Sequence, residues 1–160
     1  MRNYLPNDEE SKHFACLLQW DNIYYQEPTE EYISPKTTVR VGLVQWQMRS
    51  YKTLDDLFEQ VEFFVDSVSG YQSDFVLFPE YFNAPLMARF NDASESQAIR
   101  GLARYTDEIR ERFINLAIRY NINIITGSMP LIKEDGLLYN VGFLCRRDGT
   151  YEMYEKLHVT

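Results

Sequence analysis

The sequence predicts an α/β fold in which strands alternate with helices that cross over a sheet. Short β-branched apolar runs alternate with two longer segments whose apolar residues recur every three or four positions. The final part is different, because the turn at Asp148-Gly149 joins two strand-like runs into an antiparallel hairpin. We therefore expect the order strand, helix, strand, helix, strand, strand, strand, with the crossover helices early and the hairpin late.

The first predicted strand covers 39–45, a β-branched apolar run of strand length. A helix follows, opened by Thr53 with Asp56 three residues later, which is a variant of the capping box. Ser69-Gly70 should end this helix. Its apolar residues fall on one face: Leu54, Leu57, Phe58, Val61, Phe64, Val65 and Val68.

The second strand is predicted at 75–78, where a short continuous apolar run is typical of a strand covered on both sides. Pro79 should end it, because proline cannot donate a hydrogen bond to the neighbouring strand. A short helix near Ala98 is one interpretation of the next stretch. Thr106 is predicted to cap a second long helix, whose apolar residues are Ile109, Phe113, Leu116 and Tyr120.

Three further strands complete the predicted unit. They cover 122–126, 137–145 and 150–155, and the last two form the hairpin. Neither an internal repeat nor a low-complexity segment is evident in the sequence.

Composition excludes several classes of partner. Sixteen basic residues against twenty-four acidic residues give a net charge of −8, which disfavours nucleic acid and anionic membranes. No apolar run approaches the roughly 20 residues of a membrane-spanning helix. The N-terminus lacks the apolar core of a signal peptide, and the two cysteines form no motif. These features indicate a cytoplasmic protein.

Residues 1–37 differ from the rest and are interpreted as a connector segment. They hold an acidic run and many aromatic side chains, among them Trp20, Tyr24 and Tyr25. A free tail rarely carries so many aromatics, so we expect these three rings to anchor the connector on the surface of the α/β unit. Residues 38–160 are expected to form the other domain.

Two charged residues follow predicted strands and could carry chemistry. Glu80 comes directly after the second strand, at the edge where open α/β sheets place ligand groups, and Lys156 follows the last strand. Each residue taken alone is better read as a solvated surface charge. Cys16 and Cys145 are better read as small core residues than as nucleophiles.

No metal or cofactor site is predicted. His13 and His158 share no ligand spacing with a cluster of Cys, Asp or Glu, and no glycine-rich phosphate loop is present.

An ordered set of motifs changes the interpretation of the two charged residues. Each motif is weak alone, but in this order and at these intervals the set resembles the nitrilase superfamily of carbon–nitrogen hydrolases, from about Val39 to Thr160. The motifs are Val-Gly-Leu-Val-Gln at 41–45, Phe-Pro-Glu at 78–80, Ile-Ile-Thr-Gly-Ser-Met-Pro at 124–130, Tyr-Asn-Val-Gly-Phe at 139–143, Arg-Asp-Gly at 147–149 and Tyr-Glu-Lys-Leu-His-Val-Thr at 154–160.

The resemblance implies the N-terminal portion of a nitrilase-type α-β-β-α sandwich and a Glu-Lys-Cys mechanism. Glu80 matches the family's general base and Lys156 its catalytic lysine, while Tyr139 and Asn140 match the segment that leads into the strand before the lysine. The family's cysteine would lie beyond Thr160. If so, Glu80 and Lys156 should meet at the carboxyl ends of neighbouring strands, with their charged atoms within about 4 Å.

The function implied by the resemblance is hydrolysis of carbon–nitrogen bonds other than peptide bonds, on a small-molecule amide or nitrile. This chain alone is expected to be an inactive fragment of a homo-oligomeric enzyme. The segment 14–25 also resembles the junction in bacterial proteins where an N-acetyltransferase precedes a nitrilase-like domain. The alternative is a non-catalytic interaction or regulatory module attached to such an acetyltransferase. An unrelated flavodoxin-like binding domain would need a phosphate loop that the sequence lacks.

Overall fold

The structure is a computed structural model that describes residues 38–157. The predicted connector at 1–37, with Trp20, Tyr24 and Tyr25, lies outside the described residues.

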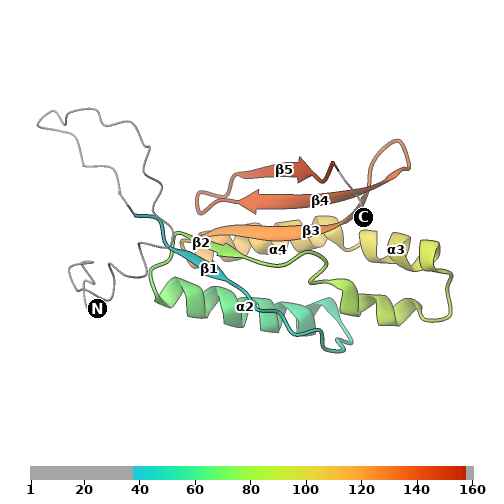
Figure 1. The fold of residues 1–160 in the computed structure, drawn as a ribbon, viewed down its shortest axis with the longest axis horizontal. Coiled ribbons are helices and arrows are strands. Elements are labelled where there is room, and N and C mark those ends of the chain that lie inside the picture. The colour runs from blue at the N-terminus through green and yellow to red at the C-terminus, as the bar shows by residue number, and fades with distance from the viewer. Residues whose placement is uncertain (1–37, 158–160) are drawn as a thin grey trace, which may run out of the picture. The chain divides into compact units, whose positions relative to one another are not determined.

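One five-stranded sheet organises these residues, with the strands in the order β1-β2-β3-β4-β5 (Figure 1). The first three strands run parallel to one another, β4 pairs antiparallel with β3, and β5 pairs antiparallel with β4. This arrangement confirms the predicted α/β fold with a late hairpin. The strands are β1 (Val41–Leu43), β2 (Phe75–Leu77), β3 (Asn123–Ile132), β4 (Leu138–Cys145) and β5 (Tyr151–Glu155).

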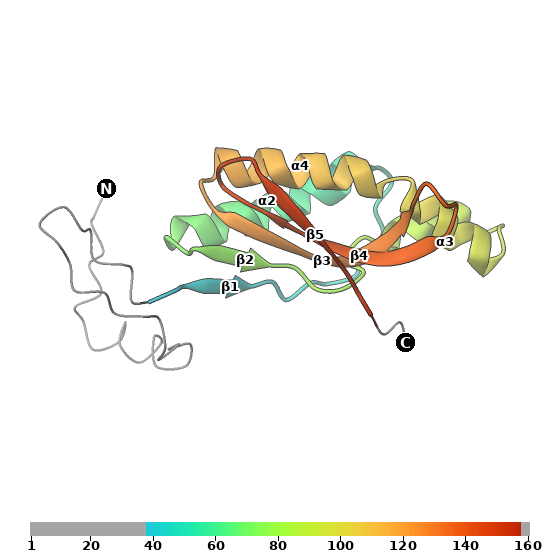
Figure 2. The ribbon, with the colours of Figure 1, turned by 90° about the horizontal axis from the view of Figure 1, so that it is seen from above.

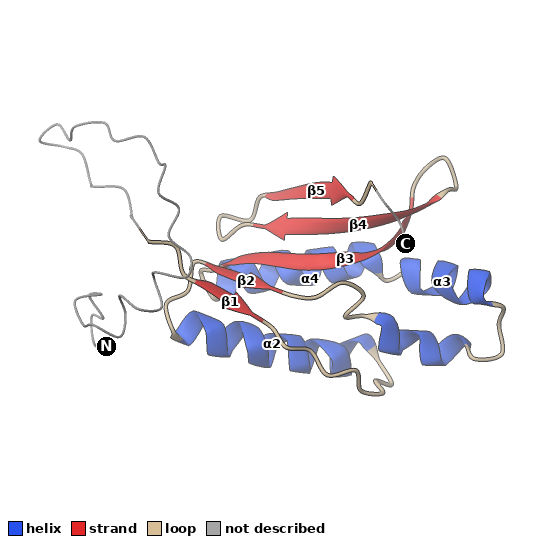
Figure 3. Cartoon of the chain, in the orientation of Figure 1, coloured by secondary structure: helices blue, strands red, loops and turns tan. Residues whose placement is uncertain are grey.

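Two long helices, α2 (Leu54–Gly70) and α4 (Thr106–Arg119), lie on the same face of the sheet (Figure 2). Between β2 and α4 the chain forms the 3₁₀ helix η1 (Ala84–Phe90) and the helix α3 (Glu95–Ala103), as Figure 3 shows. The short helix expected near Ala98 is therefore present, whereas η1 was not predicted. Both segments belong to the long connection that follows β2.

The N-terminus of α2 confirms the predicted capping box. The hydroxyl of Thr53 accepts a hydrogen bond from the backbone N–H of Asp56 at 3.1 Å. The Asp56 carboxylate in turn accepts one from the N–H of Thr53 at 3.0 Å. Two backbone N–H groups that a helix end would leave unpaired are thus satisfied reciprocally.

The prediction that Thr106 caps the second long helix is wrong. Tyr105 occupies the N-cap position of α4, and Thr106 is already the first helical residue. The Thr106 hydroxyl is buried and donates to the carbonyl of Pro130 in β3 at 2.6 Å. The hydroxyl that was expected to cap the helix therefore forms a tertiary hydrogen bond with β3.

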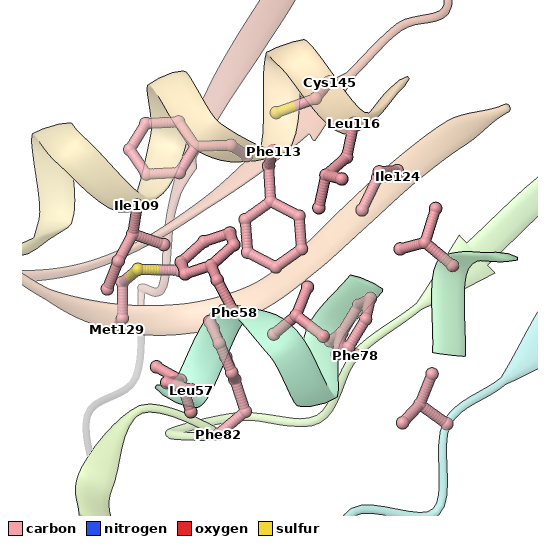
Figure 4. Packing of buried hydrophobic residues seen from close by; sticks show 14 of the residues in the cluster. Leu57, Phe58, Phe78, Phe82, Ile109, Phe113, Leu116, Ile124, Met129 and Cys145 are labelled. Atoms are coloured by element: carbon pink, nitrogen blue, oxygen red, sulfur yellow. The ribbon is translucent and has the colours of Figure 1, made fainter. Parts of the chain in front are cut away.

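Four phenylalanines connect the two long helices to the chain that leaves β2 (Figure 4). The Phe113 ring of α4 lies 5.4 Å from that of Phe58 in α2, measured between centroids. It lies 5.2 Å from Phe78 and 5.5 Å from Phe82. All four side chains are buried, so the segment between Phe78 and Phe82 is anchored at both ends in the core.

β3 is longer than the predicted strand at 122–126. It continues through Gly127 to Ile132, and its register with β4 shifts between Ile125 and Ser128. Gly127 has φ +70°, a backbone conformation that favours glycine, so it forms an irregularity within the strand and does not end it.

Candidate active site

Glu80 and Lys156 are 76 positions apart in the sequence and form an ion pair, with 2.7 Å between Lys156 Nζ and Glu80 Oε1. The predicted approach within about 4 Å is confirmed. The two strands are not neighbours, however, because β3 and β4 lie between β2 and β5. Glu80 reaches Lys156 because β2 ends early, at Leu77, and leaves the following residues free to extend beyond it.

The backbone around Glu80 is held on β3. The Phe78 N–H donates to the carbonyl of Ile125 at 2.9 Å, and the Tyr81 N–H donates to that of Ser128 at 2.8 Å. Tyr81 has φ +54°, which is uncommon for a residue with a side chain and marks a sharp local turn. A Cβ on Gly127 would lie 2.3 Å from the Pro79 carbonyl oxygen, so only glycine permits this close approach.

Asn140 contacts both members of the ion pair. Its side-chain amide Nδ2 donates to Glu80 Oε1 at 3.0 Å. Its backbone carbonyl accepts a hydrogen bond from the backbone N–H of Lys156 at 2.8 Å. The Asn140 residue is 5% exposed, whereas the side chains of Lys156 and Glu80 are 30% and 46% exposed. A buried amide thus lies beside a charged pair that solvent can reach.

The pairing of β4 with β5 places a tyrosine beside the ion pair. Gly142 lies opposite Tyr154, and alternate residues of a strand share a face, so Tyr154 and Lys156 lie on one face with Asn140 and Gly142. The Tyr154 ring lies against Gly142, since a Cβ there would be 2.2 Å from the ring carbon Cζ. Any larger residue at 142 would displace this ring.

The surroundings of Glu80 favour its charged form. Hydrogen bonds from Lys156 and then from Asn140 lower the pKa of Glu80 below its ordinary value of 4.5, against the opposing effect of burial. Burial raises the pKa of Tyr154, and the charge of Glu80 raises it further while Lys156 lowers it. Tyr81 is affected in the same way. The two tyrosines therefore lie within electrostatic reach of both charged groups.

Residues 40–160 match the family model of the carbon-nitrogen hydrolases. The chain belongs to the carbon–nitrogen hydrolase family. It is also 39% identical, over 159 residues, to a probable hydrolase of Bacillus subtilis (strain 168). That match covers 99% of this chain but only 31% of the relative, so the chain spans less than a third of the relative's length.

Solved structures of other carbon–nitrogen hydrolases share the fold. A carbon–nitrogen hydrolase from Helicobacter pylori G27 superposes with a TM-score of 0.62 at 18% identity, covering 76% of this chain and 40% of that one. An amidase from Nesterenkonia sp. gives 0.60 at 19% identity, covering 76% and 44%. These similarities confirm a nitrilase-type fold over the part of the chain that was expected to carry it.

Cys145 of this carbon–nitrogen hydrolase chain does not lie beside the ion pair. It pairs with Tyr151 at the start of β5, whereas Lys156 follows the end of that strand. Its side chain points to the opposite face from Asn140, because five positions along a strand reverse the face. The thiol is fully buried, and burial raises its pKa to about 12.

Neither a metal site nor a membrane helix emerges from residues 38–157. No group of three or more His, Cys, Asp or Glu side chains in that range could hold a metal ion. No helix within that range is long and apolar enough to cross a membrane.

Sequence reasoning missed the contribution of Asn140 and Tyr154 to this site. Asn140 was matched to a family motif but given no role, and Tyr154 was quoted only as a neighbour of Lys156. The alternation of strand residues could have placed Tyr154 on the face of Lys156. The contact of Asn140 with Glu80 depends on where the chain goes after β2, for which the sequence holds no local signal.

Proposed function

We propose that Glu80 and Lys156 are the general base and the oxyanion-stabilising cation of an amidase- or nitrilase-type hydrolase. The observation that carries this proposal is their 2.7 Å contact across 76 positions, on side chains that remain partly open to solvent. A structural ion pair needs no such access, whereas a catalytic pair must be reached by the substrate and by the nucleophile.

The chemistry requires a thiolate next to this pair. Glu80 takes the proton of a cysteine thiol, and the thiolate attacks the carbon of an amide to form a tetrahedral oxyanion. The ammonium of Lys156 stabilises that oxyanion. Collapse of the intermediate breaks the carbon–nitrogen bond, and Glu80 returns the proton to the departing amine. Water, deprotonated by Glu80, then attacks the thioester carbon. Breaking of the carbon–sulfur bond releases the acid, and Glu80 returns the proton to the departing thiolate.

We further propose that the nucleophile is a cysteine beyond Thr160, and not Cys145. Five strand positions separate Cys145 from Asn140, a distance of about 17 Å at 3.3–3.4 Å per residue. Its thiol is buried on the helix-covered face, with a pKa raised to about 12. A thiol of this kind is almost entirely protonated at neutral pH and therefore unreactive. Cys16 lies outside the described residues.

Known relatives support a cysteine mechanism. One structure of the Nesterenkonia sp. AN1 amidase shows acrylamide added at the active-site cysteine of that protein. This chain covers 45% of that amidase and 31% of the Bacillus subtilis relative, so most of each relative has no counterpart here. The proposed activity thus belongs to a full-length protein that includes this chain.

Substitution of the ion pair in the full-length protein tests the catalytic roles. Glu80→Gln and Lys156→Gln should each lower kcat/KM on amides by about 100-fold or more, as loss of a catalytic acid–base or oxyanion group does. Lys133 and Glu155 form a second Lys–Glu pair on the same sheet and supply the matched control. Lys133→Gln and Glu155→Gln should leave kcat/KM within about twofold, since exposed ion pairs contribute little.

Full activity in Glu80→Gln, together with unchanged folding, would contradict the proposal. A full-length protein that hydrolyses no amide or nitrile even without substitution would instead favour a non-catalytic interaction module built on the same fold.

A further inference from the structure

The hydrogen bonds that Lys156 and Asn140 donate to Glu80 use the same carboxylate oxygen. Lys156 Nζ lies 2.7 Å from Oε1, and Asn140 Nδ2 lies 3.0 Å from that same atom. Neither of these two bonds uses Oε2, and the Ser128 side chain is the weakest of the groups whose hydrogen bonds lower the pKa of this carboxyl. A carboxylate accepts a proton through an unoccupied lone pair, so this arrangement leaves Oε2 as the oxygen able to act as a base.

Asn140 is placed to couple the two charged groups. Its side chain holds Glu80, and its backbone carbonyl holds the backbone N–H of Lys156. β4 therefore fixes both residues through a single position, although they lie 76 positions apart in the sequence. Because Asn140 is only 5% exposed, its amide is shielded from a substrate and acts through Glu80.

The orientation of the Asn140 amide is set by Glu80. Its Oδ1 is buried and has no hydrogen-bond partner in the part of the chain that the structure describes. A buried carbonyl oxygen without a donor lowers stability, and such groups are uncommon in folded proteins. The reverse orientation would point Oδ1 at the Glu80 carboxylate, which would repel it. The Asn140 amide thus donates to the Glu80 carboxylate, while the amide oxygen Oδ1 has no donor among the described residues.

We infer that Asn140 is a positioning residue, which keeps Glu80 ionised and turned so that Oε2 is free to take the proton. The inference rests on the proposed role of Glu80 as the general base. It adds that the base depends on a buried neutral donor as well as on Lys156. Lys156 can then interact with the oxyanion while Asn140 continues to hold the carboxylate.

The pKa of Glu80 in this chain, measured by carboxyl-carbon NMR titration, tests the inference directly. Asn140→Ala should raise that pKa, because a hydrogen bond to the charged form is lost. Asn140→Asp, similar in size, should raise it further, because a second carboxylate repels the first. Both variants keep the backbone bond between Asn140 and Lys156. The control is Thr126→Val, which removes a different buried polar group, the hydroxyl that accepts from the Phe143 N–H, and should leave the pKa of Glu80 unchanged.

Activity of the full-length protein supplies a second readout. Asn140→Ala should lower kcat by roughly 10-fold with little change in KM, the size of effect usual for a residue that orients another. The acidic limb of its pH–rate profile should move to higher pH, which simple destabilisation would not do. Thr126→Val should not move that limb.

The outcomes separate the inference from the function on which it rests. An unchanged Glu80 pKa in both Asn140→Ala and Asn140→Asp would overturn the inference, whatever the activity. If the pKa rises in the expected order but Glu80→Gln keeps full activity, the proposed function fails. Asn140 would then stand as the group that controls the ionisation of Glu80.

Discussion

Gly127 and Gly136 both have a left-handed backbone, with φ +70° and +75°, but their surroundings differ. A Cβ at 136 would have nothing within 4 Å, whereas one at 127 would meet the carbonyl of Pro79 at 2.3 Å. The contact at 127 is with backbone, which cannot rotate away as a flexible side chain could. Gly127 is thus part of what sets the position of Glu80, the residue after Pro79.

Alanine at these two positions should separate backbone strain from steric contact. Gly136→Ala should lower the free energy of unfolding by about 1 kcal/mol, the cost of the unfavourable φ alone. Gly127→Ala should lower it by about 3 kcal/mol or more, because the backbone of Pro79 must also move. Urea denaturation of both variants measures the difference. Equal losses would show that the close approach at Pro79 is not a constraint.

Glu80 and Lys156 could be identified as candidate site residues from the sequence, but the way in which the two side chains come into contact could not. Each follows a strand, and strand ends can be read from apolar runs and from Pro79. Their meeting depends on the short length of β2 and on the turn at Tyr81, whose φ of +54° no propensity would assign to tyrosine. Such strained positions are set by the tertiary structure, so local patterns cannot predict them.

Among the secondary-structure elements, α2 was the best predicted because its signals are local. Thr53 and Asp56 lie three residues apart and satisfy each other's backbone N–H groups. Thr53→Ala should lower the free energy of unfolding by about 1 kcal/mol, since the backbone N–H of Asp56 loses the hydroxyl that accepts its hydrogen bond. Thr53→Ser keeps the hydroxyl and should lose less than half as much. The comparison is made by urea denaturation, and equal losses would mean that the capping box does not stabilise the helix.

β3 continues beyond the predicted end at residue 126 and contains a proline. Proline usually ends a strand, but Pro130 lies within β3 and pairs with Asn140. The carbonyl of Asn140 faces β5, where it accepts from Lys156, so the Asn140–Pro130 pair is not hydrogen-bonded. The carbonyl of Pro130 accepts from Thr106. Pro130 therefore loses no hydrogen bond to β4 through its missing N–H. This depends on the register of the two strands, which cannot be read from the sequence.

The 3₁₀ helix η1 was missed for a related reason. It is seven residues long and begins with Ala84-Pro85, where an apolar periodicity has no room to develop. Short 3₁₀ segments carry weak sequence signals and form where the surrounding structure requires a tight connection.

For the whole molecule, the sheet has one covered face and one that is more open. Val76 and Ile124 are fully buried on the face covered by α2 and α4, whereas Leu43 and Tyr154, on the other face, are exposed. The chain also spans only 31% of the Bacillus subtilis relative. Both facts agree with the proposal that the complete active site belongs to a longer protein, in which Glu80 and Lys156 are joined by a cysteine from another segment.

The most direct test of this account is to identify the cysteine that becomes acylated. The full-length protein and the 160-residue chain are incubated with a panel of amides and nitriles, quenched, and mapped by peptide mass spectrometry. The account predicts a thioester adduct on a cysteine beyond Thr160 in the full-length protein, and no adduct on Cys16 or Cys145 in either sample. An acyl adduct on Cys145 or Cys16, with turnover lost when that residue is replaced by alanine, would contradict it.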